Sequence, residues 1–210
     1  MATDYPLVGP PTISLATFGS VLRSAGSPMA AEAPAIYSAI LAKGVDPAVV
    51  LAISQHESNF GKAGIAVGRN NPYGSRYYGG AAAYGATNRG GWAAFPNYAQ
   101  AAAYTAGLLA SGSYAGAGLT ARTFPTRYAP ASDGNKPAAY GTAIVNAINR
   151  WRGEPTVGAT PKATRRTDAP KAQAPAGAPV HVTARVDPGA AIGIVALLAI
   201  LAVAFVIVRE

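Results

Sequence analysis

The segment LAISQHESNFG, residues 51–61, places one carboxyl group at the end of an apolar helical stretch. That group belongs to Glu57, the only acidic residue between Asp46 and Asp133. An apolar setting and the negative end of a helix dipole both favour the protonated form of a carboxylic acid. Such a group can donate a proton to a leaving oxygen near neutral pH. Glu57 is therefore the candidate catalytic residue; the alternative is an exposed glutamate at a frayed helix end.

Aromatic residues crowd the segment that follows, interleaved with Gly, Asn and Arg. They are Tyr73, Tyr77, Tyr78, Tyr84, Trp92, Phe95 and Tyr98. Aromatic side chains with polar neighbours are typical platforms for sugar rings, although Phe95 and Trp92 are also expected to pack in the core. The density of Gly and Tyr predicts a short β-hairpin or a long loop between Tyr73 and Trp92.

Apolar helices are expected to position these side chains. Gly44 suits the end of a first helix, and Asp46 and Pro47 suit the N-cap and first residue of a second. Glu57 falls one turn after Ile53 on the apolar face of that second helix. The expected helices cover residues 29–43, 48–59, 98–110 and 138–151, and the segment TFPTRYAPASDGNKP before the last helix is expected to be a loop.

Composition excludes several kinds of chemistry. The chain of 210 residues contains no cysteine, which rules out disulfides, a thiolate nucleophile and cysteine-ligated zinc. His56 and His181 lie far apart in unrelated contexts, so we expect no metal site and no cofactor. The net charge of +8 favours anionic polymers as partners. No nucleic-acid-binding motif is present, so nucleic acid is not an expected partner.

The C-terminal part of the chain is predicted to form a linker followed by a membrane anchor. Residues 189–208 are uncharged and long enough to cross a bilayer as one helix. Residues 154–188 are basic and rich in Pro and Ala, which predicts a semi-extended linker. Residues 1–28 resemble no signal peptide and are expected to be an irregular lead-in. These boundaries leave residues 29–153 as the folded domain.

Four short motifs, in order, resemble the glucosaminidase family of peptidoglycan hydrolases, which have a lysozyme-like fold. The helix motif matches SQHESNFG, the family's NxFG turn matches Asn71-Pro72-Tyr73-Gly74, and two later motifs match FPNYAQAAAYTAGLL and YAPASDGNKPAAY. The resemblance covers roughly residues 30–152. It implies a mainly α fold (α+β, lysozyme-like) with a small β-hairpin or long loop, to which the C-terminal transmembrane helix is added.

The same resemblance implies cleavage of β-1,4-linked glycan strands of peptidoglycan. Glu57 would protonate the glycosidic oxygen, Tyr140 would stabilise charge near the reacting centre, and the backbone at Gly74 would let the sugar approach closely. The side chains that would shape the cleft are Asn71, Tyr73 and Tyr98.

One departure from the family concerns the second carboxylate that glycosidases usually need. Residues 58–132 contain no Asp or Glu, and Asp133, the remaining candidate, lies in a Gly/Asn-rich loop of unknown placement. The sequence therefore favours a one-acid outcome, either lytic transglycosylase-like or assisted by the substrate's N-acetyl group. The alternative function is a non-catalytic cell-wall-binding or structural membrane protein that retains the fold.

The basic residues before the apolar run predict a single-pass, tail-anchored protein with its domain on the cytoplasmic side. That orientation conflicts with a wall-cutting role in an ordinary bacterial inner membrane. A virion membrane of a phage resolves the conflict, with the enzyme aiding genome entry and having membrane or capsid partners. Both locations stay open as hypotheses.

Overall fold

The computed structural model describes residues 4–155. Most of the linker predicted over residues 154–188 and the whole apolar run 189–208 lie outside the described residues. Within residues 4–155, none of the helices has the length and apolar character needed to cross a membrane.

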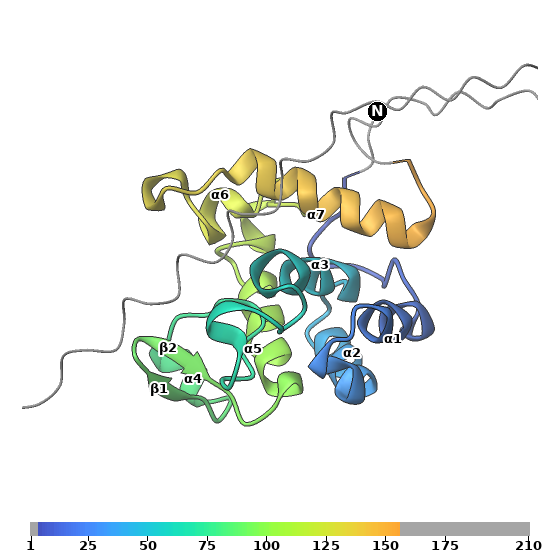
Figure 1. Cartoon of the computed structure of the whole chain (residues 1–210). Helices are drawn as coiled ribbons and strands as arrows, with labels where there is room; N and C mark the ends of the chain where they lie inside the picture. The colour runs from blue at the N-terminus through green and yellow to red at the C-terminus, as the bar shows by residue number, and fades with distance from the viewer. Residues whose placement is uncertain (1–3, 156–210) are drawn as a thin grey trace, which may run out of the picture. The chain divides into compact units, whose positions relative to one another are not determined.

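The described part of the chain is mainly helical, with one small antiparallel hairpin, as the sequence predicts (Figure 1). The α-helices are α1 (Leu15–Ser24), α2 (Ala33–Leu41), α3 (Pro47–Ser58), α4 (Gly79–Ala82), α5 (Tyr98–Ala110), α6 (Pro125–Tyr128) and α7 (Pro137–Arg152). The strands are β1 (Thr87–Arg89) and β2 (Trp92–Ala94), joined by Gly90 and Gly91, which both have positive φ as a tight hairpin turn requires. Short 3₁₀ turns cover Pro28–Glu32, Gly64–Ala66, Ala115–Ala117 and Ala131–Asp133.

Helix α3 is the central element of the fold. It starts as predicted, because the Asp46 side chain accepts a hydrogen bond from the Ala48 amide and Pro47 occupies the first turn. Residues 47–54 are buried on every side rather than along one stripe. Helix α7 packs against α3, while α2 packs against both α3 and α5 (Figure 1). The C-terminal end of α3 emerges from this packing and carries Glu57 to the surface of a cavity.

The expectation that residues 1–28 form an irregular lead-in is wrong. This segment contains helix α1, and its apolar side chains belong to the core: Tyr5, Leu7, Ile13, Phe18 and Leu22 are all buried. The segment forms isolated β-bridges with the rest of the domain, pairing Pro6 with Thr120 and Val8 with Val45. Tyr5, Leu7 and Ile13 lie on an extended stretch and show no regular period, whereas Phe18 and Leu22 of α1 have the i, i+4 spacing of a helix, which the sequence interpretation overlooked.

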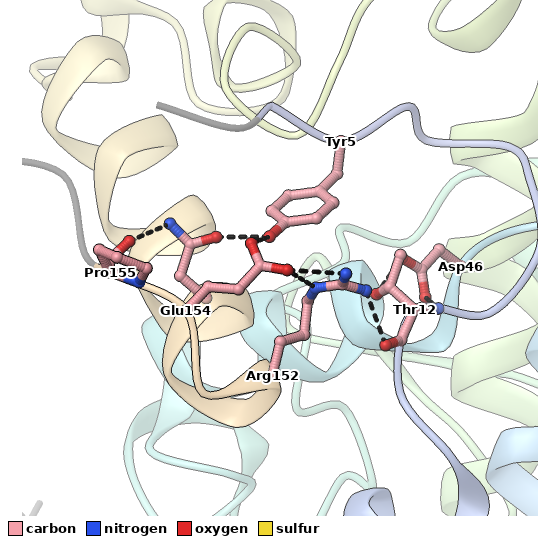
Figure 2. A network of polar contacts seen from close by, with 7 residues as sticks. Tyr5, Thr12, Asp46, Arg152, Glu154 and Pro155 are labelled. Atoms are coloured by element: carbon pink, nitrogen blue, oxygen red, sulfur yellow. Dashed lines mark hydrogen bonds and ion pairs between the residues drawn. The ribbon is translucent and has the colours of Figure 1, made fainter. Parts of the chain in front are cut away.

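A polar clasp of Tyr5, Thr12, Asp46, Asn149, Arg152 and Glu154 joins the N-terminal segment to the end of α7, and all of these except Asn149 are labelled in Figure 2. The Tyr5 hydroxyl donates to Asn149 and, at 3.2 Å, to Glu154. Arg152 Nε donates to Glu154 at 2.7 Å, and Arg152 Nη1 donates to the Thr12 carbonyl at 2.9 Å. The clasp thus joins the two ends of the described chain, and through Asp46 it includes the N-cap of α3.

The structure differs from the expected elements in three further places. The segment between Tyr73 and Trp92, expected to be a hairpin or long loop without a helix, contains the short helix α4. The helix predicted over residues 29–43 begins as the 3₁₀ turn Pro28–Glu32 and is α-helical over Ala33–Leu41. The segment predicted as a loop before α7 contains the short helix α6 and the 3₁₀ turn Ala131–Asp133. Burial of Phe124 and Pro125 against α7 stabilises α6. No local helical pattern in the sequence predicts this helix.

Candidate active site

The side chain of Glu57, in the last turn of α3, meets Tyr140 from the first turns of α7. The Tyr140 hydroxyl donates a 2.6 Å hydrogen bond to Glu57 Oε1. Tyr140 is buried, whereas Glu57 is exposed to the cavity. The carboxyl group is therefore oriented from one side and open to a ligand on the other.

Tyr140 is held from several directions. The imidazole of His56 stacks on its ring at 3.8 Å between centroids, and Phe124 meets the ring in a T-shaped contact at 5.8 Å. Burial, reinforced by Tyr128 and by the negative charge of Glu57, raises the pKa of Tyr140 well above its ordinary value. The phenol therefore keeps its proton at physiological pH and acts as a permanent hydrogen-bond donor to Glu57.

The approach of α7 to its neighbours depends on a glycine beside Tyr140. A Cβ built on Gly141 would lie 1.9 Å from the backbone oxygen of Arg122. Only glycine allows α7 to pack this closely on the segment before α6. This packing fixes α7 against the segment before α6 at the residue next to Tyr140.

The other side of the Glu57 carboxyl group faces the turn at Gly74. Gly74 has a φ of +66°, and a Cβ on it would lie 3.1 Å from Glu57 Oε2. The turn is tied to the end of α3, because the Ser58 hydroxyl donates a 2.8 Å hydrogen bond to the Pro72 carbonyl. Gly74 is therefore needed both for its backbone conformation and for space beside the carboxyl group.

Asn71 is fully buried and organises this turn from inside. Its amide nitrogen donates 2.8 Å hydrogen bonds to the carbonyls of Ser75 and Ala93, and its Oδ1 accepts a 3.0 Å bond from the Ser75 amide. The side chain thus joins the Gly74 turn to strand β2. Tyr128, which lines the cavity, adds a 2.6 Å hydrogen bond from its hydroxyl to the Tyr73 carbonyl.

These groups open onto a cavity of about 700 Å³. Its walls come from the end of α3, the Gly74 turn, the hairpin, α5, the segment through α6, and the start of α7. The polar and aromatic side chains that line it include His56, Glu57, Arg76, Tyr78, Trp92, Arg127, Tyr128, Asp133 and Tyr140. Volume and lining suit a polar ligand with flat faces, such as part of a sugar chain.

The predicted site residues separate into two groups. Glu57, Tyr140 and Gly74 lie together on the cavity wall. Asn71 and Tyr73 are fully buried, and Tyr98 is half-buried away from the cavity lining. The direct contact with a sugar implied for these three residues therefore has no support in their placement; Asn71 shapes the cleft through the backbone, and Tyr73 and Tyr98 pack in or against the core.

The cavity residues that were not singled out from the sequence include Arg76, Arg127 and Tyr128, whereas Trp92 was expected as a sugar platform or a core residue. The guanidinium of Arg76 lies 4.0 Å from the centroid of the Trp92 ring, and the two form a flat, cationic element of the wall. Tyr128 and Arg127 come from α6, which the sequence did not predict. The isolated β-bridge between Arg76 and Trp92 brings these two residues together, and no local pattern in the sequence indicates this pairing.

Within residues 4–155, no group of three or more His, Asp or Glu side chains is arranged to hold a metal ion. Comparison of the chain with protein-family models, with curated proteins and with solved structures finds no match.

Proposed function

We propose that this protein cleaves the β-1,4-linked glycan strands of peptidoglycan, with Glu57 as the general acid. The observation that carries the proposal is the hydrogen bond from a buried, permanently protonated Tyr140 to a glutamate that faces a cavity of sugar-binding size. The sequence resemblance to the glucosaminidase family supports the same residue and the same substrate.

The geometry suits proton donation. As Glu57 gives its proton to the leaving glycosidic oxygen, negative charge develops on its carboxylate. The Tyr140 hydroxyl already points at Oε1, so the charge is stabilised as it forms and no group has to reorient. The small residue at Gly74 leaves the other carboxyl oxygen accessible to the bond that breaks.

Aromatic residues elsewhere on the cavity wall offer a place for the sugar rings. Trp92 and Tyr78 supply aromatic surface, and Tyr78 is the more exposed, at 66%. Stacking of a pyranose ring on such a surface would position the glycosidic bond without requiring a charged ligand group. The guanidinium of Arg76, which lies over the Trp92 ring, adds hydrogen-bond donors beside this aromatic surface.

The test is product analysis with the full-length chain. Wild-type protein and Glu57→Gln are incubated with purified peptidoglycan, and the soluble products are examined by mass spectrometry. Wild type should release glycan fragments, and Glu57→Gln should release them at least about 100-fold more slowly because the proton donor is lost. Release at equal rates would overturn the role of Glu57. If neither protein releases fragments but both sediment with the peptidoglycan, the protein is a wall-binding module instead.

The proposal includes a membrane tether. Residues 189–208 supply an uncharged run of membrane-spanning length, and residues 154–188 would separate the domain from it. Expression of the full chain and of a chain ending at Pro155, followed by carbonate extraction of membranes, tests this. The full chain should stay with the membrane pellet while the shorter one is released; release of both would exclude an integral anchor.

A further inference from the structure

The surroundings of each acidic side chain of residues 4–155 indicate whether that side chain stabilises the fold or faces the cavity. Those residues are Asp4, Glu32, Asp46, Glu57, Asp133 and Glu154. Four of them support the fold. Asp4 accepts hydrogen bonds from Thr120 and from the Arg122 amide. Glu32 accepts one from the Ala99 amide, and Asp46 accepts hydrogen bonds from Thr12 and from the Ala48 amide. Glu154 forms an ion pair with Arg152. The remaining two, Glu57 and Asp133, are the carboxyl groups that line the cavity.

Asp133 makes no contact that holds distant parts of the chain together. The hydrogen bond that it receives comes from the hydroxyl of its neighbour Ser132, at 3.2 Å, and both residues are exposed. Its position is nevertheless defined, because it ends the 3₁₀ turn Ala131–Asp133 and Gly134 continues the chain with a φ of +79°. The Asn135 side chain closes this loop by donating to the Pro130 carbonyl at 3.3 Å.

Asp133 lines the same cavity as Glu57, and the elements on either side of its loop are bonded close to Glu57. The loop follows α6, whose Tyr128 is bonded to the Tyr73 carbonyl in the turn beside Glu57. It precedes α7, whose Tyr140 is bonded to Glu57 itself. The elements at both ends of the Asp133 loop are thus bonded close to Glu57. The Asp133 carboxylate is free to act on a ligand, because the side-chain hydrogen bond that it accepts comes from its neighbour Ser132.

We propose that Asp133 is the second catalytic carboxylate and acts as the general base for water. This inference rests on the proposed glycan-cleaving function. Asp133 takes a proton from a water molecule whose oxygen forms a bond to the anomeric carbon. The bond from that carbon to the glycosidic oxygen breaks at the same time, and Glu57 gives its proton to the departing oxygen. The reaction is hydrolysis by single displacement, and it inverts the configuration at the anomeric carbon.

Such a pairing does not need an acidic residue in the hairpin. The two carboxylates come from α3 and from the loop between α6 and α7, and both line one cavity of about 700 Å³. The one-acid routes make different products. Assistance by the substrate's N-acetyl group leaves a reducing end of retained configuration, and transglycosylation leaves an anhydro end without a reducing group.

The deciding measurement is proton NMR of the first products released by the full-length wild-type protein. Asp133 as base predicts that newly formed reducing ends appear first as the α anomer and equilibrate afterwards. First appearance of the β anomer, or of anhydro ends, overturns the inference while leaving the proposed function intact. Absence of any product from wild type sinks the proposed function itself.

Variants of the loop test whether Asp133 is the residue responsible for the α-anomeric product. Asp133→Asn should lower kcat about 10²- to 10⁴-fold, the usual cost of losing a general base. The matched control is Lys136→Gln, which changes the charge of the same loop by one unit and lies outside the cavity lining; it should stay within about twofold of wild type. Asp133→Asn activity equal to that of Lys136→Gln overturns the assignment.

Chemical rescue separates loss of the base from loss of the fold. Azide added to Asp133→Ala needs no base, so it should restore turnover and yield the α-glycosyl azide. A variant that fails to bind glycan cannot be rescued in this way. Binding of glycan by Asp133→Ala without azide rescue would show that the carboxylate does not act on water.

Discussion

Tyr140 and Glu57 are 83 positions apart in the chain, yet their side chains are joined by a 2.6 Å hydrogen bond. The bond links the last turn of α3 to the first turns of α7 at the wall of the cavity. It is partly screened from water, and once Glu57 has given up its proton the acceptor is a carboxylate, so the bond then belongs to the stronger class of protein hydrogen bonds. The site therefore has a built-in means of stabilising the charge that appears when Glu57 loses its proton.

Tyr140→Phe removes this bond and keeps the ring. A hydrogen bond to a charged group contributes about 1.5–3 kcal/mol, so kcat on peptidoglycan should fall about 10- to 100-fold. The stacking on His56 and the contact with Phe124 need no hydroxyl, and the melting temperature should change little. Unchanged kcat would mean that the bond orients Glu57 without taking part in catalysis.

Gly74→Ala should impair both stability and activity. The added methyl group meets Glu57 Oε2 at 3.1 Å, on a backbone with φ +66° that disfavours any L side chain. Gly68→Ala is the matched control, because Gly68 has a φ of +71° and open space around the new methyl group. Both variants should lose about 1–2 kcal/mol of stability in urea denaturation. Only Gly74→Ala should also lower kcat; equal activity in the two would contradict the crowding of Glu57.

Gly141→Ala should destabilise the domain by about 2–4 kcal/mol, because its methyl group would sit 1.9 Å from the Arg122 carbonyl oxygen and α7 would have to move. Gly19→Ala, inside α1, provides the comparison. Its methyl group meets the far end of the flexible Arg23 side chain, at 3.0 Å, which can move aside. That change should be neutral or stabilising by up to about 1 kcal/mol. Thermal denaturation of both variants measures the difference, and similar melting temperatures would refute the tight packing of α7.

The clasp predicts a pH window for stability. Burial, followed by the hydrogen bond to Glu154, raises the pKa of Tyr5 to about 12. The folded state thus holds this proton more tightly than the unfolded state, where the pKa is 10.0, so the contribution is complete below pH 10 and is lost as pH rises through 12. Arg152 lowers the pKa of Glu154 from 4.5, so that contribution is present above pH 4.5 and is lost on acidification below it.

Urea denaturation of wild type and Tyr5→Phe between pH 8 and pH 12 tests the alkaline side. Tyr5→Phe should be less stable than wild type at pH 8, and the difference should shrink as pH passes 10, because the wild-type contribution disappears. Tyr78→Phe, at an exposed position outside the clasp, should show no such convergence. A constant difference between wild type and Tyr5→Phe would exclude Tyr5 as the titrating group.

Much of the local structure could be predicted from the sequence because its causes are local. Asp46 and Pro47 start α3 through a side-chain cap and a preset φ, and both depend only on adjacent residues. Helix α5 covers residues 98–110, the bounds that its composition predicts. The same local reasoning singled out Glu57, because an acidic residue at the end of an apolar helix stands out without any knowledge of its partners.

The tertiary structure alone decided which polar and aromatic side chains face the cavity. Tyr73 and Asn71 belong to the turn beside Glu57, yet both point into the interior, while Arg76 and Trp92 from neighbouring segments face the cavity. Likewise, nothing near Asp133 in the chain reveals that α6 and α7 carry its loop to the wall that Glu57 shares. The physical reason is that helix caps and hairpin turns are short-range interactions, whereas the direction of a side chain in a loop is set by packing against segments far away in the sequence.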